Sequence, residues 1–395
     1  MSAAAPSGET YRVAQPVAAG VVTAVVGFSS SFVVVLAGLT AVGATPAQAA
    51  SGVLALCVAQ ALGMLWLALR HRVPVSLAWS TPGAALLAST GAVAGGWPAA
   101  VGAFVVTGVL VVLTGLVPAL GNLVGRIPPS LARAMLAGVL LPLCAEPAIA
   151  LVRSPLLVGP VVLTWLVLVR LTPRWAVPAA LLVAFGVVVV AGDGVAAADL
   201  APSLSVTLPA WSVSALVGVA LPLYVVTMAS QNVPGVAVMG GFGYRVPWRE
   251  SMTVTGLGTV LAAPFGGHAV NLAAITAALS AGPEAGPRHD KRWIASISAA
   301  VSYLVLAVGC AALTALVASA PDGVVQAASG LALLGTLASA LSGALESKED
   351  HLPAAVCLVV AASGVVVGGV GAGFWALVAG LVVRAVLTRV SPAAP

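Results

Sequence analysis

Two short motifs interrupt apolar runs of this chain with residues that suit the binding of an anion. The first is Trp79-Ser80-Thr81-Pro82-Gly83, and the second is Phe265-Gly266-Gly267-His268. Ser80 and Thr81 are N-cap candidates, and Pro82 fits the first turn of a helix. Each motif therefore predicts a helix that begins inside an apolar segment. The unpaired backbone N–H groups and the partial positive charge at such a start favour a ligand such as a carboxylate.

The residues around the two motifs predict where each helix runs. Pro74 to Trp79 carries β-branched and aromatic residues and is expected to be extended before a helix over 82–90. The second motif is expected to lead into a helix from about His268 to Leu279, where Gly266 and Gly267 let a ligand approach the backbone closely. Irregular backbone at membrane depth is tolerated where it lines a buried cavity, so the two stretches predict a binding site. The alternative interpretation is two ordinary kinked helices.

A polar patch lies within the apolar run over 212–242. It extends from Thr227 to Gly235, and its Gln231 and Asn232 carry amide groups that both donate and accept hydrogen bonds. Pro234 leaves a backbone carbonyl one turn earlier without its usual partner. Polar groups at that depth are costly unless they face protein or a water-filled cavity. We favour substrate binding, with hydrogen bonding between helices as the alternative.

His268 is the one titratable side chain that we place near the predicted site. Histidine changes charge near neutral pH, so it is a candidate for coupling proton movement to anion binding. A neutral histidine that only forms a hydrogen bond is the alternative. Asn271 would lie one turn beyond His268 on the same helix face. Five aromatic residues are expected to form a flat apolar slot for a ring, with plain packing as the alternative: Phe28, Phe32, Trp79, Tyr224 and Phe265.

The composition identifies an integral membrane protein. Of the 395 residues, 61% are hydrophobic and 7% are charged, and the mean hydropathy is +1.13, whereas soluble proteins have about a quarter charged residues. Apolar runs recur throughout, so we expect one membrane domain over 1–395, with the first run kept as a span rather than cleaved as a signal peptide. The basic residues are isolated in loops, which excludes a nucleic-acid surface. The four cysteines lack metal-ligand spacing, so we expect no metal and no cofactor.

Charges, prolines and glycines divide the apolar sequence into fourteen segments. They cover about 17–39, 47–69, 74–90, 98–118, 130–151, 156–171, 175–192, 212–242, 250–263, 265–281, 293–319, 323–345, 352–369 and 371–389. The third, ninth and tenth are shorter than the roughly 20 residues that cross the hydrocarbon core. If all fourteen cross and both termini are cytoplasmic, fifteen of the sixteen Lys and Arg residues lie on the cytoplasmic side, and only Arg153 lies outside.

Seven segments in each half predict two repeats of opposite orientation. The third and tenth segments then occupy matching positions, which is typical of a midplane site in a secondary transporter. The predicted fold is an all-α membrane protein with two half-helices, segments three and ten, each preceded by an extended stretch. Repeat one covers 12–192, an extracellular linker covers 193–211, and repeat two covers 212–390.

Three motifs resemble the benzoate/proton symporter family of bacterial inner membranes. They are Ala78-Trp79-Ser80-Thr81-Pro82-Gly83-Ala84-Ala85-Leu86, Met228-Ala229-Ser230-Gln231-Asn232-Val233-Pro234-Gly235 and Pro264-Phe265-Gly266-Gly267-His268-Ala269-Val270-Asn271-Leu272-Ala273-Ala274-Ile275-Thr276. The third is the most specific, and the match extends over about 12–389. The resemblance implies uptake of benzoate or a similar aromatic carboxylate together with H+ across the inner membrane. It also implies a likeness to nucleobase permeases, with core segments within 17–118 and 212–319 and gate segments within 130–192 and 323–389.

One departure bears on the substrate. Nucleobase permeases contact their substrate through acidic residues on the eighth and tenth helices, whereas this chain has Gln231 and His268 in those regions. The lack of a fixed negative charge favours an anion. We therefore expect proton-coupled uptake of an aromatic carboxylate by alternating access. A carrier of another small anion or of a nucleobase on the same fold is the alternative, an enzyme is disfavoured because no catalytic pair appears, and a homodimer stays open.

Overall fold

The computed structural model describes residues 13–125, 127–192, 194–195, 200–274, 276–368 and 370–390. Arg12 and Arg126, two of the basic residues counted above, lie outside them, as do parts of the predicted linker. Helices make up nearly all of the regular structure that is described, and two short strands form one sheet.

Most of the elements lie within the predicted segments, and the stretch over 265–281 is the main exception. In chain order they are α1 (Ala14–Ser29), α2 (Phe32–Ala41), α3 (Pro46–His71), β1 (Leu77–Trp79), α4 (Thr81–Thr90), α5 (Gly96–Leu116), α6 (Pro118–Gly125), α7 (Pro129–Arg153), α8 (Pro155–Leu171), α9 (Pro173–Ala191), α10 (Val213–Ala215), η2 (Leu216–Ala220), α11 (Leu221–Thr227), η3 (Met228–Asn232), α12 (Val233–Gly241), α13 (Trp248–Ala262), η4 (Ala263–Phe265), β2 (Val270–Leu272), α14 (Ala277–Ala281), η5 (Pro283–Ala285), η6 (His289–Lys291), α15 (Trp293–Val308), α16 (Cys310–Ala318), α17 (Val324–Ala344), η7 (Lys348–Asp350), α18 (His351–Ala362) and α19 (Ala372–Val390). Eight helical stretches among the described residues are long and apolar enough to cross a membrane. Fourteen crossings stay a prediction.

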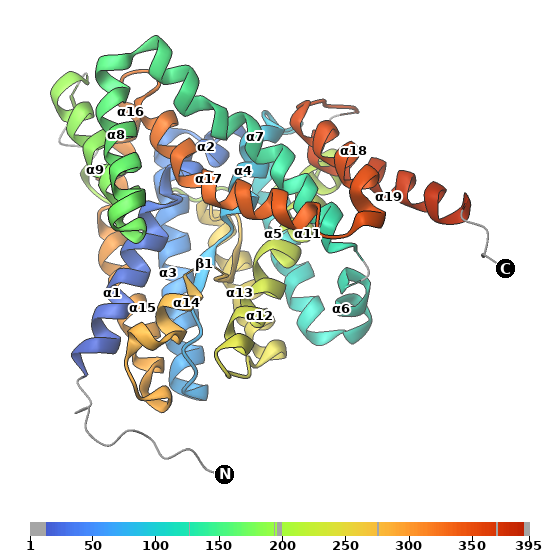
Figure 1. Cartoon of the computed structure of the whole chain (residues 1–395), viewed down its shortest axis with the longest axis horizontal. Coiled ribbons are helices and arrows are strands. Elements are labelled where there is room, and N and C mark those ends of the chain that lie inside the picture. The colour runs from blue at the N-terminus through green and yellow to red at the C-terminus, as the bar shows by residue number, and fades with distance from the viewer. Residues whose placement is uncertain are drawn as a thin grey trace.

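The helices pack in two groups (Figure 1). In the first group α1 and α3 pack against α15, α5 packs against α13, and α2 packs against α4. In the second group α7 packs against α17 and α18, α8 against α9, and α18 against α19. The groups meet where α4 contacts α7, α2 contacts α17 and α1 contacts α9. Movement of one group against the other stays a prediction.

The two strands pair with each other where β1 contacts α3 and β2 contacts α13, a place that we call the strand crossing. β1 and β2 pair in antiparallel register, with Ala78 opposite Asn271 and Trp79 opposite Val270. The helix α4 begins directly after β1 at Thr81, close to the predicted start at residue 82. The structure therefore brings together the two stretches that the sequence analysis singled out.

The second helix was predicted wrongly. The structure has an extended segment at His268 and β2 where the helix was expected, and α14 begins only at Ala277. The reason lies in the backbone amides, which pair with other segments instead of with the carbonyls one turn earlier. The Val270 N–H donates to Thr259 Oγ1 (2.9 Å), and the Leu272 N–H donates to Asn232 Oδ1 (2.8 Å).

The helix over 213–241 contains two π-helical turns. The turns η2 and η3 each end two residues before a proline, Pro222 and Pro234. A proline inside a helix lacks an N–H, and its ring clashes with the carbonyl four residues earlier. Those carbonyls belong to Gly218 and Ser230, the third residues of the two π-helical turns. The wider turns therefore accommodate the prolines, and η3 coincides with the predicted polar patch.

The first predicted span is interrupted by three serines, a feature that sequence reasoning missed. α1 ends at Ser29 and α2 begins at Phe32. The hydroxyl of Ser29 donates to Val25 O (2.7 Å), and the hydroxyl of Ser31 donates to Gly27 O (3.1 Å). Such bonds from serine to carbonyls in the preceding turn compete with the helical pattern and bend helices.

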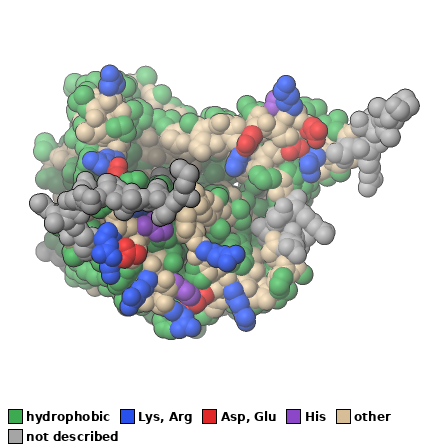
Figure 2. Space-filling view, turned by 60° about the horizontal axis from the view of Figure 1, so that its bottom comes forward, with side chains coloured by type: hydrophobic (Ala, Val, Ile, Leu, Met, Phe, Trp, Pro, Cys, Tyr) green, Lys and Arg blue, Asp and Glu red, His purple; other side chains and the backbone are tan. Residues whose placement is uncertain are grey.

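Charged side chains gather on one face of the molecule. Figure 2 shows many Lys and Arg side chains on the face that lies at the bottom of Figure 1. Arg70 and Arg72 at the end of α3 and Arg249 at the start of α13 belong to segment ends that the sequence analysis places in the cytoplasm. A gathering of this kind agrees with the positive-inside rule. The orientation of the termini stays a prediction.

A buried carboxylate ties three elements of the second group together. Asp350 at the end of η7 accepts hydrogen bonds from Ser130 Oγ of α7 (2.6 Å) and from Arg384 Nε of α19 (2.7 Å). Burial by itself raises the pKa of the Asp350 carboxyl, but the two hydrogen bonds and the guanidinium charge outweigh it, so the pKa lies below its ordinary value. The ionised carboxylate therefore holds α7, α18 and α19 together at neutral pH.

Close packing of α5 against α13 depends on glycine. A Cβ at Gly256 would lie 2.6 Å from Gly108 O and 2.7 Å from Val112 N. We expect Gly256→Ala to push the helices apart and to lower the free energy of unfolding by about 1–3 kcal/mol. Gly240→Ala is the control, because nothing lies within 4 Å of a Cβ there. Thermal unfolding in detergent measures both variants, and equal melting temperatures would contradict this account of the packing.

Candidate functional site

Ser80 is the junction of the site, between β1 and α4. Its Oγ accepts hydrogen bonds from the Gly83 N–H (3.1 Å) and from Thr227 Oγ1 (3.0 Å). Its N–H donates to Ala269 O beyond the end of β2 (3.0 Å). Ser80 is fully buried. The N–H, carbonyl and Oγ of Ser80 each have a partner within the protein, so the residue builds the start of α4.

Thr81 is the first residue of α4 and remains free to bind. Ser80 accepts hydrogen bonds from the N–H groups of Gly83 and Ala84, and Pro82 has no N–H. No hydrogen bond joins the Thr81 N–H or hydroxyl to another residue that the structure describes, and Thr81 is half-buried. A single backbone N–H and the neighbouring hydroxyl are therefore the donors at this helix start.

His268 lies beside this junction. Its Nε2–H donates to the Ser80 carbonyl (2.9 Å), which fixes the tautomer because a carbonyl only accepts. The imidazole is fully buried, with the Phe104 ring edge-on at 6.4 Å between centroids. Its Nδ1 has no partner among the described residues. The ring thus presents an unsatisfied acceptor inside the protein.

The side-chain amides of Asn271 and Asn232 form hydrogen bonds with the backbone of the strand region. Asn271 lies on β2, so it does not share a helix face with His268, which corrects the prediction. In the orientation that satisfies its amide, Asn271 donates to Ala78 O (3.2 Å) and accepts from Ser80 N (3.2 Å). Asn232 donates to Met228 Sδ (3.1 Å) in addition to accepting from Leu272 N. Both are fully buried.

Gln231 differs from its neighbour Asn232. It lies in the π-helical turn η3 with 8% of its surface exposed. No hydrogen bond of its side chain joins it to the described part of the chain, and its amide atoms are not fully enclosed. Of the two amides in the polar patch, Gln231 is the one available to a ligand.

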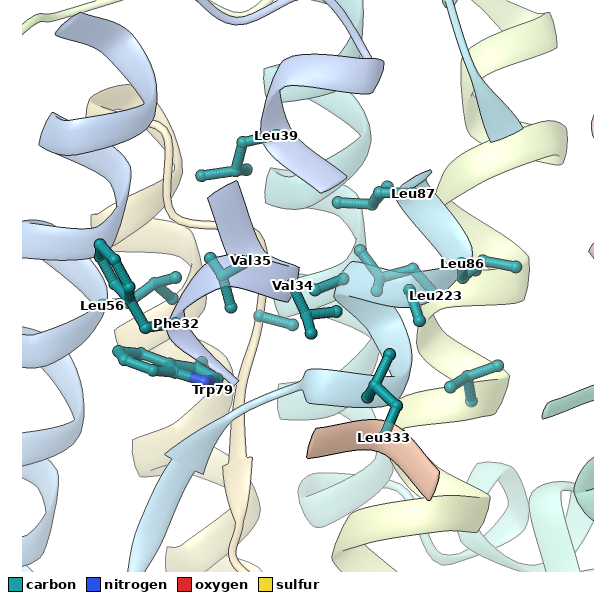
Figure 3. Packing of buried hydrophobic residues seen from close by; sticks show 14 of the residues in the cluster. Phe32, Val34, Val35, Leu39, Leu56, Trp79, Leu86, Leu87, Leu223 and Leu333 are labelled. Carbon is teal, nitrogen blue, oxygen red and sulfur yellow. The ribbon is translucent and has the colours of Figure 1, made fainter. Parts of the chain in front are cut away.

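Three of the predicted aromatic residues form a stack against the strand crossing. Phe28 and Phe32 lie parallel with ring centroids 5.0 Å apart, and Phe28 meets the Trp79 ring edge-on at 5.5 Å. Figure 3 shows Phe32 beside Trp79 at the end of β1. The Trp79 indole N–H donates to Ser31 Oγ (2.7 Å). These three rings form an apolar wall beside the strand crossing. Phe28 has the largest exposed fraction of the three, 4%.

The other two predicted aromatic residues lie elsewhere. Tyr224 of α11 shares a hydrogen bond between its hydroxyl and that of Thr114 on α5. Phe265 lies in η4, where its carbonyl accepts from Ser51 Oγ on α3 (2.9 Å). Neither has a ring contact with the stack among the described residues.

The two glycines of the second motif serve close packing of the chain. Gly266 has φ of 99°, a left-handed conformation that favours glycine. A Cβ there would lie 2.9 Å from Gln48 O on α3. A Cβ at Gly267 would lie 2.6 Å from the Ala262 side chain. At these glycines it is therefore neighbouring protein atoms that approach the backbone closely. The same holds at Gly83, where the Leu223 and Ser80 side chains occupy the place that a Cβ would take.

Sequence reasoning missed two hydroxyl groups, those of Thr276 and Tyr303. Thr276 immediately precedes α14, and Tyr303 of α15 meets the Trp79 ring at 6.3 Å between centroids. Thr276 falls within the third quoted motif, so its position was a usable signal. Tyr303 lies in an apolar run with no spacing that would mark it. Tyr303 is 2% exposed and Thr276 is 8% exposed.

The donor set suits a small anion with an apolar body. Thr81, Gln231, Thr276 and Tyr303 supply neutral hydrogen-bond donors, and His268 supplies a nitrogen that can take a proton. None of these side chains is a carboxylate. Among the described residues, no group of three His, Cys, Asp or Glu side chains is arranged to hold a metal ion.

Comparisons with known proteins identify relatives over nearly the whole chain. The profile of the family described as benzoate membrane transport protein matches residues 12–386. The inner membrane protein YdcO of Escherichia coli is 39% identical over 376 residues, which are 94% of this chain and 96% of that protein. A benzoate membrane transport protein of Acinetobacter baylyi is 30% identical over 346 residues, 86% of each chain.

Solved structures share the fold. The transmembrane domain of the cyanobacterial bicarbonate transporter BicA superposes with a TM-score of 0.60 at 16% identity, over 94% of this chain and 98% of that one. The murine anion transporter Slc26a9 in its inward-facing state gives 0.63 at 13% identity, over 97% of this chain and 69% of that one. At these identities the likeness shows the fold alone.

The different roles of Asn232 and Gln231 are testable by matched substitutions. Asn232→Leu keeps the volume but leaves the buried Leu272 N–H without its acceptor, so we expect the free energy of unfolding to fall by about 1–3 kcal/mol. Gln231→Met also keeps the volume, breaks no hydrogen bond, and is expected to change stability by less than about 0.5 kcal/mol. Denaturant or thermal unfolding measures both, and an equal loss in the two variants would refute the distinction.

Proposed function

This chain belongs to the benzoate membrane transport family, whose members are membrane transporters and not enzymes, and we propose that it imports benzoate or a similar aromatic carboxylate together with a proton by alternating access. The Acinetobacter baylyi relative, 30% identical, is named a benzoate membrane transport protein. The observation that carries the proposal is the donor set at the strand crossing, which offers hydroxyls, an amide and a backbone N–H but no carboxylate.

The binding mode follows from which donors are free. We propose that the substrate carboxylate lies at the start of α4, near Thr81 and the Pro82-Gly83 turn, with Gln231 as a lateral donor. The aromatic ring of the substrate would pack on the wall formed by Phe28, Phe32 and Trp79. Ser80, Asn232 and Asn271 then act through the backbone that they position. A fixed carboxylate in this set would repel such a substrate, and none is present.

The buried imidazole of His268 supports coupling to a proton. Its Nε2–H is committed to the Ser80 carbonyl, so an incoming proton can bind only at Nδ1. A protonated imidazole buried without a counter-charge is costly, and so is a buried carboxylate. A bound carboxylate therefore lowers the free-energy cost of protonating the buried imidazole, and the protonated imidazole lowers the cost of burying the carboxylate. By linkage, the proton raises the affinity for the anion by the same factor that the anion raises the affinity for the proton.

Alternating access would arise from the two groups of helices. We propose that the first group is a core domain that carries the site and that the second is a gate domain, arranged as two inverted repeats of seven segments each. The fold shared with the two anion transporters supports this arrangement. We place the chain in the bacterial inner membrane with both termini in the cytoplasm.

A second candidate is a carrier of another small anion. The solved structures with this fold are named as a bicarbonate transporter and an anion transporter. The donor set is compatible with a small inorganic anion, whereas the wall of three aromatic rings favours a substrate with an aromatic body.

Uptake of labelled benzoate into proteoliposomes tests the proposal. With an inward proton gradient imposed by a more acidic exterior, we expect accumulation that unlabelled benzoate abolishes and that uracil and bicarbonate leave unchanged. Collapse of the gradient with a protonophore serves as the control for coupling. Competition by bicarbonate but not by benzoate would instead support the second candidate.

His268→Gln separates the structural role of this residue from its role in coupling. The glutamine amide can still donate to the Ser80 carbonyl, but it cannot take up a proton near neutral pH. We expect benzoate exchange without a gradient to remain within about threefold of the wild type, a barrier change below about 1 kcal/mol, while gradient-driven accumulation is lost. Accumulation that persists in His268→Gln would remove His268 from the coupling step.

A further inference from the structure

The hydroxyl of Tyr303 is an unusual group for the interior of this protein. Tyr303 lies in the middle of α15 and is 2% exposed. No hydrogen bond joins its hydroxyl to any residue that the structure describes, although buried tyrosine hydroxyls usually find a partner. Leaving such a group unpaired costs free energy that an apolar side chain of the same shape avoids. The position therefore indicates a donor kept for a ligand.

The surroundings of the Tyr303 hydroxyl are built from the same elements as the candidate site. The Tyr303 ring stands edge-on to Trp79, the last residue of β1. The hydroxyl lies against Gly27 of α1, where a Cβ would overlap it. The methyl group of Thr276 would lie 3.5 Å from that same Cβ. Gly27 therefore leaves room for the Tyr303 hydroxyl, and Thr276 lies beside the same position.

Thr276, whose methyl group lies near the Gly27 position, carries a second unpaired hydroxyl. Its side chain is 8% exposed, and its hydroxyl caps no backbone group of α14. Among the described residues, its Oγ1 forms no hydrogen bond. Two side chains with unpaired hydroxyls thus lie beside the same glycine, Tyr303 through its hydroxyl and Thr276 through its methyl group.

We propose that Tyr303 and Thr276 donate hydrogen bonds to the substrate carboxylate, and that Gly27 is required because its missing side chain leaves room for the Tyr303 hydroxyl. The inference rests on the proposed function, since it assigns two further specificity-determining residues to the same site. Together with Thr81 and Gln231 the pair gives four neutral donors, and the two oxygens of a carboxylate offer about four lone-pair sites to accept from them.

Benzoate binding to purified Tyr303→Phe tests the assignment. The substitution removes only an unpaired hydroxyl, so we expect the melting temperature without ligand to stay at the wild-type value or to rise above it. We expect the benzoate concentration for half-maximal uptake to rise about tenfold or more, as for loss of a hydrogen bond to a charged group, and the benzoate-induced rise in melting temperature to shrink accordingly. Tyr224→Phe is the matched control, because its hydroxyl bonds to Thr114 and lies outside the pair.

A double substitution tests the role of Gly27 independently. Gly27→Ala should lower the melting temperature because the new methyl group collides with the Tyr303 hydroxyl. In the Tyr303→Phe background the hydroxyl is absent, so Gly27→Ala should cost markedly less. Equal losses in the two backgrounds would overturn the proposed contact.

The outcomes distinguish this inference from the function on which it rests. A wild-type protein that neither takes up benzoate nor is stabilised by it would overturn the proposed function and this assignment together. A wild type that responds to benzoate, with Tyr303→Phe and Thr276→Val both at wild-type half-saturation, would overturn the assignment alone. A tenfold loss in Tyr303→Phe with no loss in Tyr224→Phe supports it.

Discussion

The structure depends on the pairing of two extended segments inside an apolar interior. Backbone N–H and C=O groups there have no water to bond with, and each unpaired group costs several kcal/mol in a membrane. Backbone groups of β1 and β2 bond to one another in antiparallel register. The N–H and C=O groups that this pairing leaves without a partner need partners on other residues. Thr259, Asn232 and Asn271 supply them. Polar side chains on α13, η3 and β2 are thus required by the backbone before any ligand is considered.

This requirement divides the polar residues into two sets. The first set builds the crossing and has its hydrogen bonds filled within the protein, as in Ser80, Asn232 and Asn271. The second set has unfilled hydrogen-bonding capacity and borders the same crossing. It consists of Thr81, Gln231, His268 Nδ1, Thr276 and Tyr303. On the proposed function, we expect the second set to recognise the ligand and the first to position it, so that substitutions in the first set act on stability and those in the second on affinity.

Much of this arrangement was predictable because its signals are local. Serine, threonine and proline before a short apolar run predicted the start of α4, and the structure begins that helix at Thr81. The second half was predicted less well, because Val270 to Ala273 contains nothing that excludes a helix. Its extended shape comes from partners far away in the chain, such as Ser76, whose carbonyl accepts from the Ala273 N–H (2.9 Å). Periodicity within a single segment carries no information on such pairing.

The two amides of η3 show how a local backbone irregularity separates residues that sequence reasoning treats alike. Gln231 and Asn232 are adjacent, and both were predicted to bind substrate. In the structure Pro234 imposes a π-helical turn on the residues before it, as Pro222 does twelve residues earlier. Turns of this kind recur at functional sites. The wider turn leaves Asn232 directed at the Leu272 N–H of β2 while Gln231 stays unpaired. A proline four residues after Ser230 thus separates the amide that bonds to β2 from the amide that stays unpaired.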